Sequence, residues 1–187
     1  DQDYNLSTAL GGLTHGVTPL EMVQAYGVLA NGGIKVQPTA ILKIVDRNGQ
    51  VVEEHSIQEK RVVDEKDAAI ITNMLESVIN GGTGGNAAIG RPAAGKTGTT
   101  DDSKDAWFVG YTPDLVAAVW IGDDYGSETL RGITGGNTPA IMWGQFMANA
   151  LANTPASDFP VPSSAQSAIS EGYFNPVKVQ PKKDDKK

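Results

Sequence analysis

The sequence predicts a mixed α/β (α+β) fold in which an antiparallel sheet is covered by helices. Three apolar segments with strand composition follow one another at 93–99, 105–111 and 115–122. Their connections are far shorter than the dozen or more residues of a parallel crossover, so the strands must pair antiparallel. Apolar residues at helical spacing over about 19–31 and 65–80, followed by a last helix at about 139–153, supply the covering elements.

The ends of these helices are marked by capping residues. Thr18 is expected to cap the first helix, with Pro19 at its first position and Glu21 at the capping-box spacing. Asp64 is expected to cap the second helix, and a Thr-Pro pair opens the third. Glycine pairs follow the first two helices and are typical of helix ends.

A β-hairpin is predicted between the first two helices. The apolar segment 40–45 is followed by the turn 46–49 and by the short apolar segment 50–52. Asn48 and Gly49 supply the positive φ that a tight reversal requires.

The chain has 187 residues, enough for one domain with a real core. We assign residues 1–153 to that domain. Residues 154–187 are rich in Pro, Ser and Lys without periodicity, so a largely disordered tail is expected there.

Composition excludes several classes of function. The net charge is −7, and five of the 15 basic residues are lysines after position 177. An acidic body is a poor ligand for a phosphate backbone, so nucleic acid is not an expected partner. The chain has no cysteine, which removes disulfides and thiolate sites together. No run of 18 apolar residues is present, so membrane attachment is expected only through an upstream anchor that this chain lacks.

No metal or organic cofactor is expected. His15 and His55 have no second ligand at metal spacing. The acidic pairs at 101–102 and 123–124 stand at loop ends, where carboxylates usually face solvent.

Residues 90–97 match the string G-x-x-x-x-G-K-[ST] of phosphate-binding loops. That loop works only between a strand and a helix, because loop amides and the helix N-terminus together bind the phosphates. Here the residues before it are rich in Gly and Asn, and those after it lead into another strand. The context argues against a nucleotide hydrolase, which Mg-ATP binding would reveal.

The same lysine begins the run Lys96-Thr97-Gly98-Thr99-Thr100. Lys-Thr-Gly is one of three motifs of serine acyl-transfer enzymes that bind β-lactams, with S-x-x-K and S-D-N. Its chemistry suits an edge strand beside a cleft. The lysine offers a fixed charge, the threonine hydroxyls can bind a carboxylate, and the glycine lets a substrate backbone lie close. The amide of Thr99 can then face a developing oxyanion.

The flanking residues extend this match along one register. They include Gly11-Gly12-Leu13 with Val17-Thr18-Pro19-Leu20-Glu21-Met22, Asp105-Ala106-Trp107-Phe108-Val109-Gly110-Tyr111-Thr112-Pro113, Val119-Trp120-Ile121-Gly122 and Thr134-Gly135-Gly136. Over about residues 6–150 the chain resembles the C-terminal part of the transpeptidase domain of class A (bifunctional) penicillin-binding proteins.

The resemblance implies a serine β-lactamase-like transpeptidase fold with a five-stranded antiparallel sheet. It implies a D,D-transpeptidase of peptidoglycan cross-linking at the extracytoplasmic face of the bacterial membrane. Stem peptides and β-lactams would be its ligands, and no cofactor is implied. Lys96 would assist proton transfer, and Thr99 would supply an oxyanion amide. Thr97, Gly98, Thr99 and Thr100 would form the substrate-binding strand.

The chain departs from the family pattern in one respect. No serine has a lysine three residues later or an asparagine two residues later, and both serine motifs belong upstream of Lys96 in this family. The nucleophile is therefore expected on an N-terminal half of the same domain, as a separate or missing chain, and this chain alone is expected to be inactive. A binding or regulatory remnant that kept the fold without the serine is the alternative.

Overall fold

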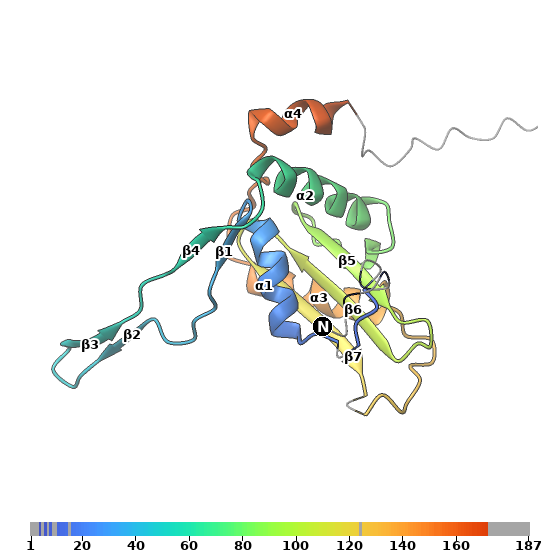
Figure 1. Ribbon diagram of the computed structural model, residues 1–187, viewed down its shortest axis with the longest axis horizontal. Coiled ribbons are helices and arrows are strands. Elements are labelled where there is room, and N and C mark those ends of the chain that lie inside the picture. Colours follow the sequence, from blue (N-terminus) through green and yellow to red (C-terminus); the bar gives the residue numbers. More distant parts are fainter. Residues whose placement is uncertain are drawn as a thin grey trace, which may run out of the picture.

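The computed structural model describes Tyr4, Leu6, Thr8 and the ranges 11–14, 16–123 and 125–171. His15, Asp124 and the tail beyond 171 lie outside these described residues, so the interpretations placed on them are not tested. Along the described ranges the chain alternates helices with short antiparallel strand pairs around one larger sheet (Figure 1).

The sheet that positions the site has the order β5-β6-β7. Its strands are β5 (Ala94–Thr99), β6 (Asp105–Tyr111) and β7 (Val116–Gly122). Both pairings are antiparallel, with Lys96 opposite Val109 and Val109 opposite Ala118. All three predicted strands are confirmed to within one residue at their ends, as is the antiparallel sheet covered by helices.

Helices cover both faces of this sheet (Figure 1). Helix α3 (Thr138–Ala150) packs on β6 and β7 from one side, while α1 (Pro19–Ala30) packs on the same two strands from the other. Helix α2 (Glu65–Asn80) runs beside β5 and also contacts α1. The short 3₁₀ helix η2 (Gly85–Ala87) connects α2 to the strand segment and packs on α3.

The core on the α3 side is built around two aromatic rings. Trp143 and Phe108 are fully buried, with their ring centroids 5.2 Å apart. The indole Nε1 of Trp143 donates to the carbonyls of Gly110 at 3.3 Å and Ala117 at 3.1 Å. These hydrogen bonds join α3 to the backbones of β6 and β7, so the helix has one defined position on the sheet.

The core on the opposite face centres on Tyr111. This ring is fully buried and meets Tyr26 of α1 and Phe159 edge-on, at centroid distances of 6.4 Å and 5.5 Å. Its hydroxyl lies 2.9 Å from that of Thr72 on α2, which is itself only 4% exposed. One tyrosine of β6 thus contacts both α1 and α2.

The capping predictions for the first two helices are confirmed. Thr18 and Glu21 form both halves of a capping box, and the Asp64 carboxylate accepts from the amide of Lys66 at 2.9 Å. Helix α3 differs, because its N-cap is Asn137 rather than the threonine of the Thr-Pro pair. The Asn137 carboxamide oxygen accepts from the amide of Thr138, a capping contact that asparagine makes readily.

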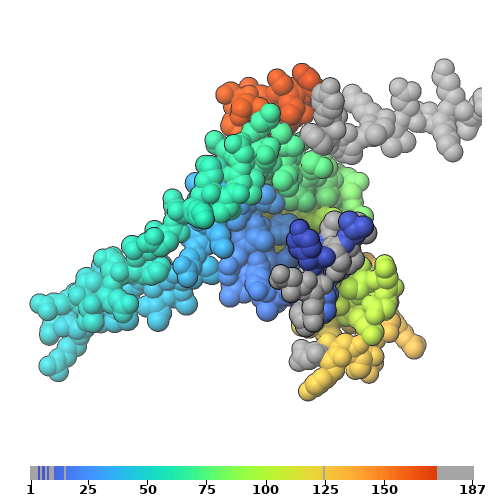
Figure 2. Space-filling view, viewed as in Figure 1, coloured from blue at the N-terminus to red at the C-terminus, as the bar shows by residue number. Residues whose placement is uncertain are grey.

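The predicted hairpin is present and forms the outer part of a projecting arm (Figures 1 and 2). Strand β2 (Lys43–Val45) pairs with β3 (Val51–Glu54), and Gly49 in the turn has φ +80°. Nearer the body, β1 (Ile34–Val36) pairs with β4 (Glu59–Arg61), a pairing that the sequence reasoning did not foresee. Three-residue strands of mixed composition carry too little alternation to be recognised.

The expectation of a disordered tail is wrong for residues 154–171. Helix α4 (Ser163–Ser170) contacts α2, and its Ala165 is buried. Upstream of it, the Arg91 guanidinium donates to the carbonyl of Thr154, and Phe159 packs on Tyr111. One guanidinium and one aromatic ring thus bind a segment whose composition alone resembles a linker.

Candidate active site

Three of the predicted substrate residues, Thr97, Gly98 and Thr99, lie on β5, which is an edge strand within the described part of the chain, and Thr100 follows the end of that strand. The amide of Thr100 donates to the carbonyl of Asp105 at 3.1 Å. Backbone groups in an antiparallel ladder alternate in direction, so the amides and carbonyls of Thr97 and Thr99 point away from β6. The Lys96 ammonium agrees with this geometry, because it donates to the carbonyl of Thr97 at 2.8 Å. The Thr99 amide is therefore oriented toward the outer edge, as an oxyanion donor must be.

Lys96 is an exposed cation at this edge. Among the described residues, no carboxylate lies within ion-pair distance of its ammonium. Its charge is thus not neutralised by any described carboxylate, and the ammonium stays within reach of groups that approach the strand.

The hydroxyls of Thr97 and Thr99 each contact a different loop. Thr97 Oγ1 lies 2.8 Å from Thr83 Oγ1, in the connection between α2 and η2. Thr99 Oγ1 accepts from the amide of Gly135 at 3.0 Å, in the loop that precedes α3. A side-chain contact joins the two loops, because Asn86 Nδ2 donates to the carbonyl of Gly136 at 2.8 Å.

The two loop glycines are required by close backbone approach. A Cβ atom on Gly135 would meet the carbonyl of Trp107 and would lie 2.5 Å from that of Gly98. A Cβ on Gly136 would meet the carbonyl of Thr83. Any larger residue would push the loop off the strand, since none of these atoms is a movable side-chain end.

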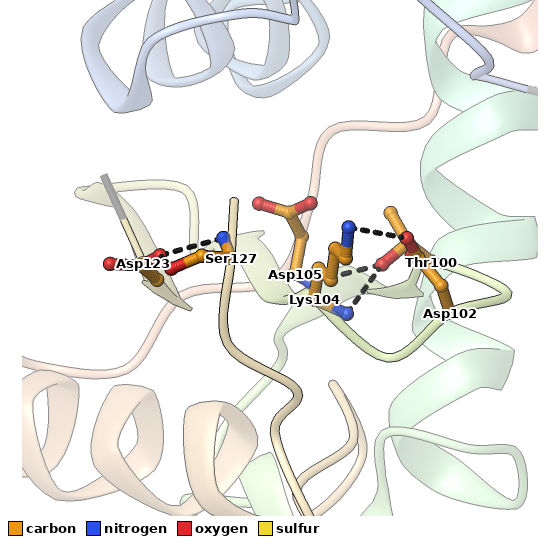
Figure 3. Close-up of polar contacts among 6 residues, drawn as sticks. All are labelled: Thr100, Asp102, Lys104, Asp105, Asp123 and Ser127. Atoms are coloured by element: carbon orange, nitrogen blue, oxygen red, sulfur yellow. Dashed lines mark hydrogen bonds and ion pairs between the residues drawn. The ribbon is translucent and has the colours of Figure 1, made fainter. Parts of the chain in front are cut away.

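Thr100 has a structural role in the turn between β5 and β6. Its Oγ1 accepts from the amides of Lys104 and Asp105, each at 3.0 Å, and Ser103 in the same turn has φ +54°. Figure 3 shows these contacts beside the exposed ion pair of Lys104 with Asp102. The Thr100 hydroxyl holds the turn, so its assignment as a substrate residue stays a prediction.

The end of β7 is closed by a similar polar turn. The hydroxyl and amide of Ser127 both donate to the Asp123 carboxylate at 2.8 Å (Figure 3), and they hold the pKa of Asp123 below its usual value. The Asp123 carboxylate thus stabilises the loop that follows β7. No group of three or more metal-binding side chains occurs among the described residues.

The three tryptophans differ in burial. Trp143 belongs to the core, whereas Trp107 and Trp120 are half-buried and pair across β6 and β7 at a centroid distance of 6.1 Å. Trp120 Nε1 donates to the Asp105 carboxylate at 2.9 Å. This pairing stiffens the strand next to β5.

The nucleotide alternative does not fit this geometry. Lys96 lies within a strand of an antiparallel sheet, and the chain after it forms a turn into β6 with no helix. No helix follows directly after Lys96 in the described part of the chain, so the string lacks the helix N-terminus that helps to bind phosphates. The rejection of this alternative from sequence context is confirmed.

Residues 83, 86 and 135 were not predicted as site residues. Glycine-rich stretches at 81–90 and 134–136 were visible in the sequence, but no spacing rule links them to β5. Only the threonine beside a glycine pair in each stretch hinted at a close backbone approach.

Comparison with known proteins agrees with this geometry. Residues 2–132 match the family described as the penicillin-binding protein transpeptidase domain. The chain is 40% identical over 157 residues to penicillin-binding protein 1A of Aquifex aeolicus, covering 83% of this chain and 21% of that protein. It is 39% identical over 177 residues to penicillin-binding protein 1A of Neisseria gonorrhoeae, covering 91% of this chain and 22% of that protein.

Solved structures show the same relationship. The chain superposes on the penicillin-binding protein PonA1 of Mycobacterium tuberculosis with a TM-score of 0.77 and 32% identity, covering 95% of this chain and 48% of that one. For penicillin-binding protein 1A of Haemophilus influenzae the TM-score is 0.74 and the identity 29%, covering 79% and 28%.

The chain belongs to the penicillin-binding protein transpeptidase domain family. The two curated relatives named above are both penicillin-binding proteins 1A, which agrees with the resemblance to class A proteins seen in the sequence. It spans about a fifth of the length of these curated relatives. Within the described residues, no helix is long and apolar enough to cross a membrane.

Proposed function

We propose that this chain supplies the substrate-binding strand of a serine D,D-transpeptidase that cross-links peptidoglycan. The observation that carries the proposal is the geometry of β5. Its edge presents the Thr99 amide, the exposed Lys96 ammonium and two threonine hydroxyls on a single strand. Family membership supports the same assignment.

The proposed reaction is acyl transfer. A serine Oγ attacks the carbonyl carbon between the last two D-alanines of a stem peptide, its proton passing to a neighbouring base. The oxyanion that forms is stabilised by two amides, one of them that of Thr99. The C–N bond then breaks, D-alanine leaves with a proton, and the acyl-serine ester remains. An amine of a second stem peptide attacks that ester and regenerates the serine.

The residues of β5 divide the work on the donor peptide. The hydroxyls of Thr97 and Thr99 bind its terminal carboxylate, and Gly98 lets its backbone lie against the strand. Lys96 lowers the energy of the charged states around the serine and assists its proton transfer. β-Lactams carry a carboxylate and a reactive amide in the same relation, so they acylate the same serine and are released slowly.

The serine belongs to an N-terminal half of the domain that is not in this chain. No S-x-x-K or S-x-N motif occurs in the sequence, and β7 has no strand partner on its outer side among the described residues. An added strand at that edge would continue the sheet. The chain alone is therefore inactive, and the assembled domain acts at the extracytoplasmic face of the membrane, anchored by an upstream segment.

Intact-mass spectrometry with and without benzylpenicillin tests this proposal. The chain is prepared alone and together with the N-terminal half of the domain. We expect one penicilloyl adduct, on the N-terminal half, and none on this chain. An adduct on this chain would disprove the assignment of the nucleophile. No adduct on the assembled domain would instead favour a remnant that kept the fold without the activity.

A matched pair of lysine variants tests the role of β5. Lys96→Ala removes the cation at the strand edge, whereas Lys104→Ala removes a partly exposed lysine of the adjacent turn. Acid–base assistance contributes about 10²-fold or more, so Lys96→Ala should slow acylation by at least that factor. Lys104→Ala should acylate at the unaltered rate. Equal effects from both variants would contradict a specific role for Lys96.

A further inference from the structure

We propose that Thr83 and the loop 134–136 are a positioning device that orients the carboxylate-binding hydroxyls of Thr97 and Thr99. This inference rests on the proposed function, because it concerns how the same site recognises the donor carboxylate. Thr83 and the loop 134–136 lie outside the Lys-Thr-Gly strand. Their hydrogen bonds determine the directions in which the hydroxyl protons of Thr97 and Thr99 can point.

The Thr99 hydroxyl is oriented by a donor that cannot reverse its role. The amide of Gly135 only donates, so Thr99 Oγ1 must accept in their 3.0 Å hydrogen bond. The proton of the Thr99 hydroxyl is therefore directed away from the loop. Since the Thr99 side chain is exposed, that proton is available to an anion that approaches the strand.

The Thr97 hydroxyl has two possible arrangements with Thr83. At 2.8 Å either oxygen can be the donor. If Thr83 donates, the proton of Thr97 is free for a ligand; if Thr97 donates, its lone pairs face the ligand and repel a carboxylate. A bound carboxylate selects the first arrangement, because only that one gives it a donor. Thr83 thus acts as a hydroxyl relay behind Thr97.

The backbone packing keeps this arrangement in place. Gly135 lies directly over the backbone of Gly98, and Gly136 lies over that of Thr83. The Asn86 carboxamide joins the two loops through the carbonyl of Gly136. Asn137 shapes the second loop from within, as its Oδ1 accepts from the amide of Thr134 and its Nδ2 donates to the carbonyl of Gly132, both at 2.8 Å. The positions of the two hydroxyl partners therefore depend on each other.

The test uses a carboxylate that can be masked. The assembled domain is acylated with benzylpenicillin and with its methyl ester, and the ratio of the two second-order rate constants measures carboxylate recognition. We expect Thr83→Val to lower this ratio about tenfold, the effect of one misaligned charge-assisted hydrogen bond, while the rate with the ester stays unchanged. Thr83→Ser, which keeps the hydroxyl, should restore the ratio.

Two controls separate positioning from general damage. Thr39→Val removes a threonine hydroxyl that also bonds to a side chain, His55 at 2.9 Å, but lies on the projecting arm, and it should leave the ratio unchanged. If Thr83 acts only through Thr97, the double variant Thr83→Val/Thr97→Val should lower the ratio no further than Thr97→Val alone.

The possible failures have different meanings. An equal loss of rate with both β-lactams in Thr83→Val would show a structural role and would overturn the positioning proposal, as would an unchanged ratio. Either result leaves the proposed transpeptidase function intact, because the unsubstituted domain still acylates. If the unsubstituted domain fails to acylate, the proposed function fails, and this inference fails with it.

Discussion

Replacing both partners of the Thr72–Tyr111 hydrogen bond should cost less than the two single replacements predict. The two oxygens lie 2.9 Å apart, with Thr72 4% exposed and Tyr111 fully buried. Tyr111→Phe leaves the threonine hydroxyl without its partner in an apolar setting, and Thr72→Val does the same to the phenol. Each single change should lower the free energy of unfolding by about 1–3 kcal/mol.

The double variant replaces the pair by apolar groups of similar shape and removes both unsatisfied atoms. Its loss should therefore be smaller than the sum of the single losses by about 1–2 kcal/mol, which is the coupling energy of the pair. Urea denaturation followed by circular dichroism measures all four proteins. A coupling energy below about 0.3 kcal/mol would refute the reasoning. It would mean that the hydroxyl of Thr72 turns to a carbonyl of its own helix when Tyr111 loses its oxygen.

Three further predictions concern pH and local backbone geometry. Burial raises the pKa of Tyr111 above its ordinary 10.0, so the neutral phenol stabilises the fold fully below pH 10 and this stabilisation is lost as the pH rises further. In urea titrations, Tyr111→Phe should therefore reduce the fall in unfolding free energy at alkaline pH. Burial raises the pKa of Glu76 above 4.5; the charge of Asp158 adds to this effect and a hydrogen bond from Asn73 opposes it. The ionised carboxylate therefore destabilises the fold at neutral pH, so Glu76→Gln should raise the melting temperature at pH 7 but not at pH 3. Gly33 has φ +92°, and a Cβ atom there would meet the Val63 carbonyl, so Gly33→Ala should lower the melting temperature. A Cβ atom on Gly32 would meet no neighbouring atom, so Gly32→Ala should lower the melting temperature by less.

The three central strands and two of the helix caps could be predicted because each depends on local sequence. Asp64 caps α2 through a contact two residues away, and β5 to β7 are joined by connections too short for anything except antiparallel pairing. The strand placement of the Lys-Thr-Gly motif could be predicted for the same reason, since its residues are contiguous in sequence.

Features that depend on contacts between distant residues were not predictable in this way. The pairing of Ile34 with Arg61 spans the whole arm, and the contact of Phe159 with Tyr111 binds a segment that composition assigned to a tail. The contact of Thr83 with Thr97 joins two loops that share no periodic pattern. In each case the structure depends on tertiary contacts that local sequence does not encode.

The loop that contacts Thr99 leads directly into the core helix α3, so core packing can affect the geometry of the site. Helix α3 starts three residues after Gly135, and Trp143 fixes that helix to β6 and β7 through two hydrogen bonds and its contact with Phe108. A shift of α3 along the sheet would carry the amide of Gly135 with it, because Asn137 both caps the helix and shapes the loop. A Trp143→Phe variant removes both hydrogen bonds while it keeps most of the apolar volume. We therefore expect it to lower carboxylate discrimination as well as stability, although its side chain lies in the core and not on the substrate strand. A loss of stability with unaltered discrimination would show that the loop holds its position independently of the helix.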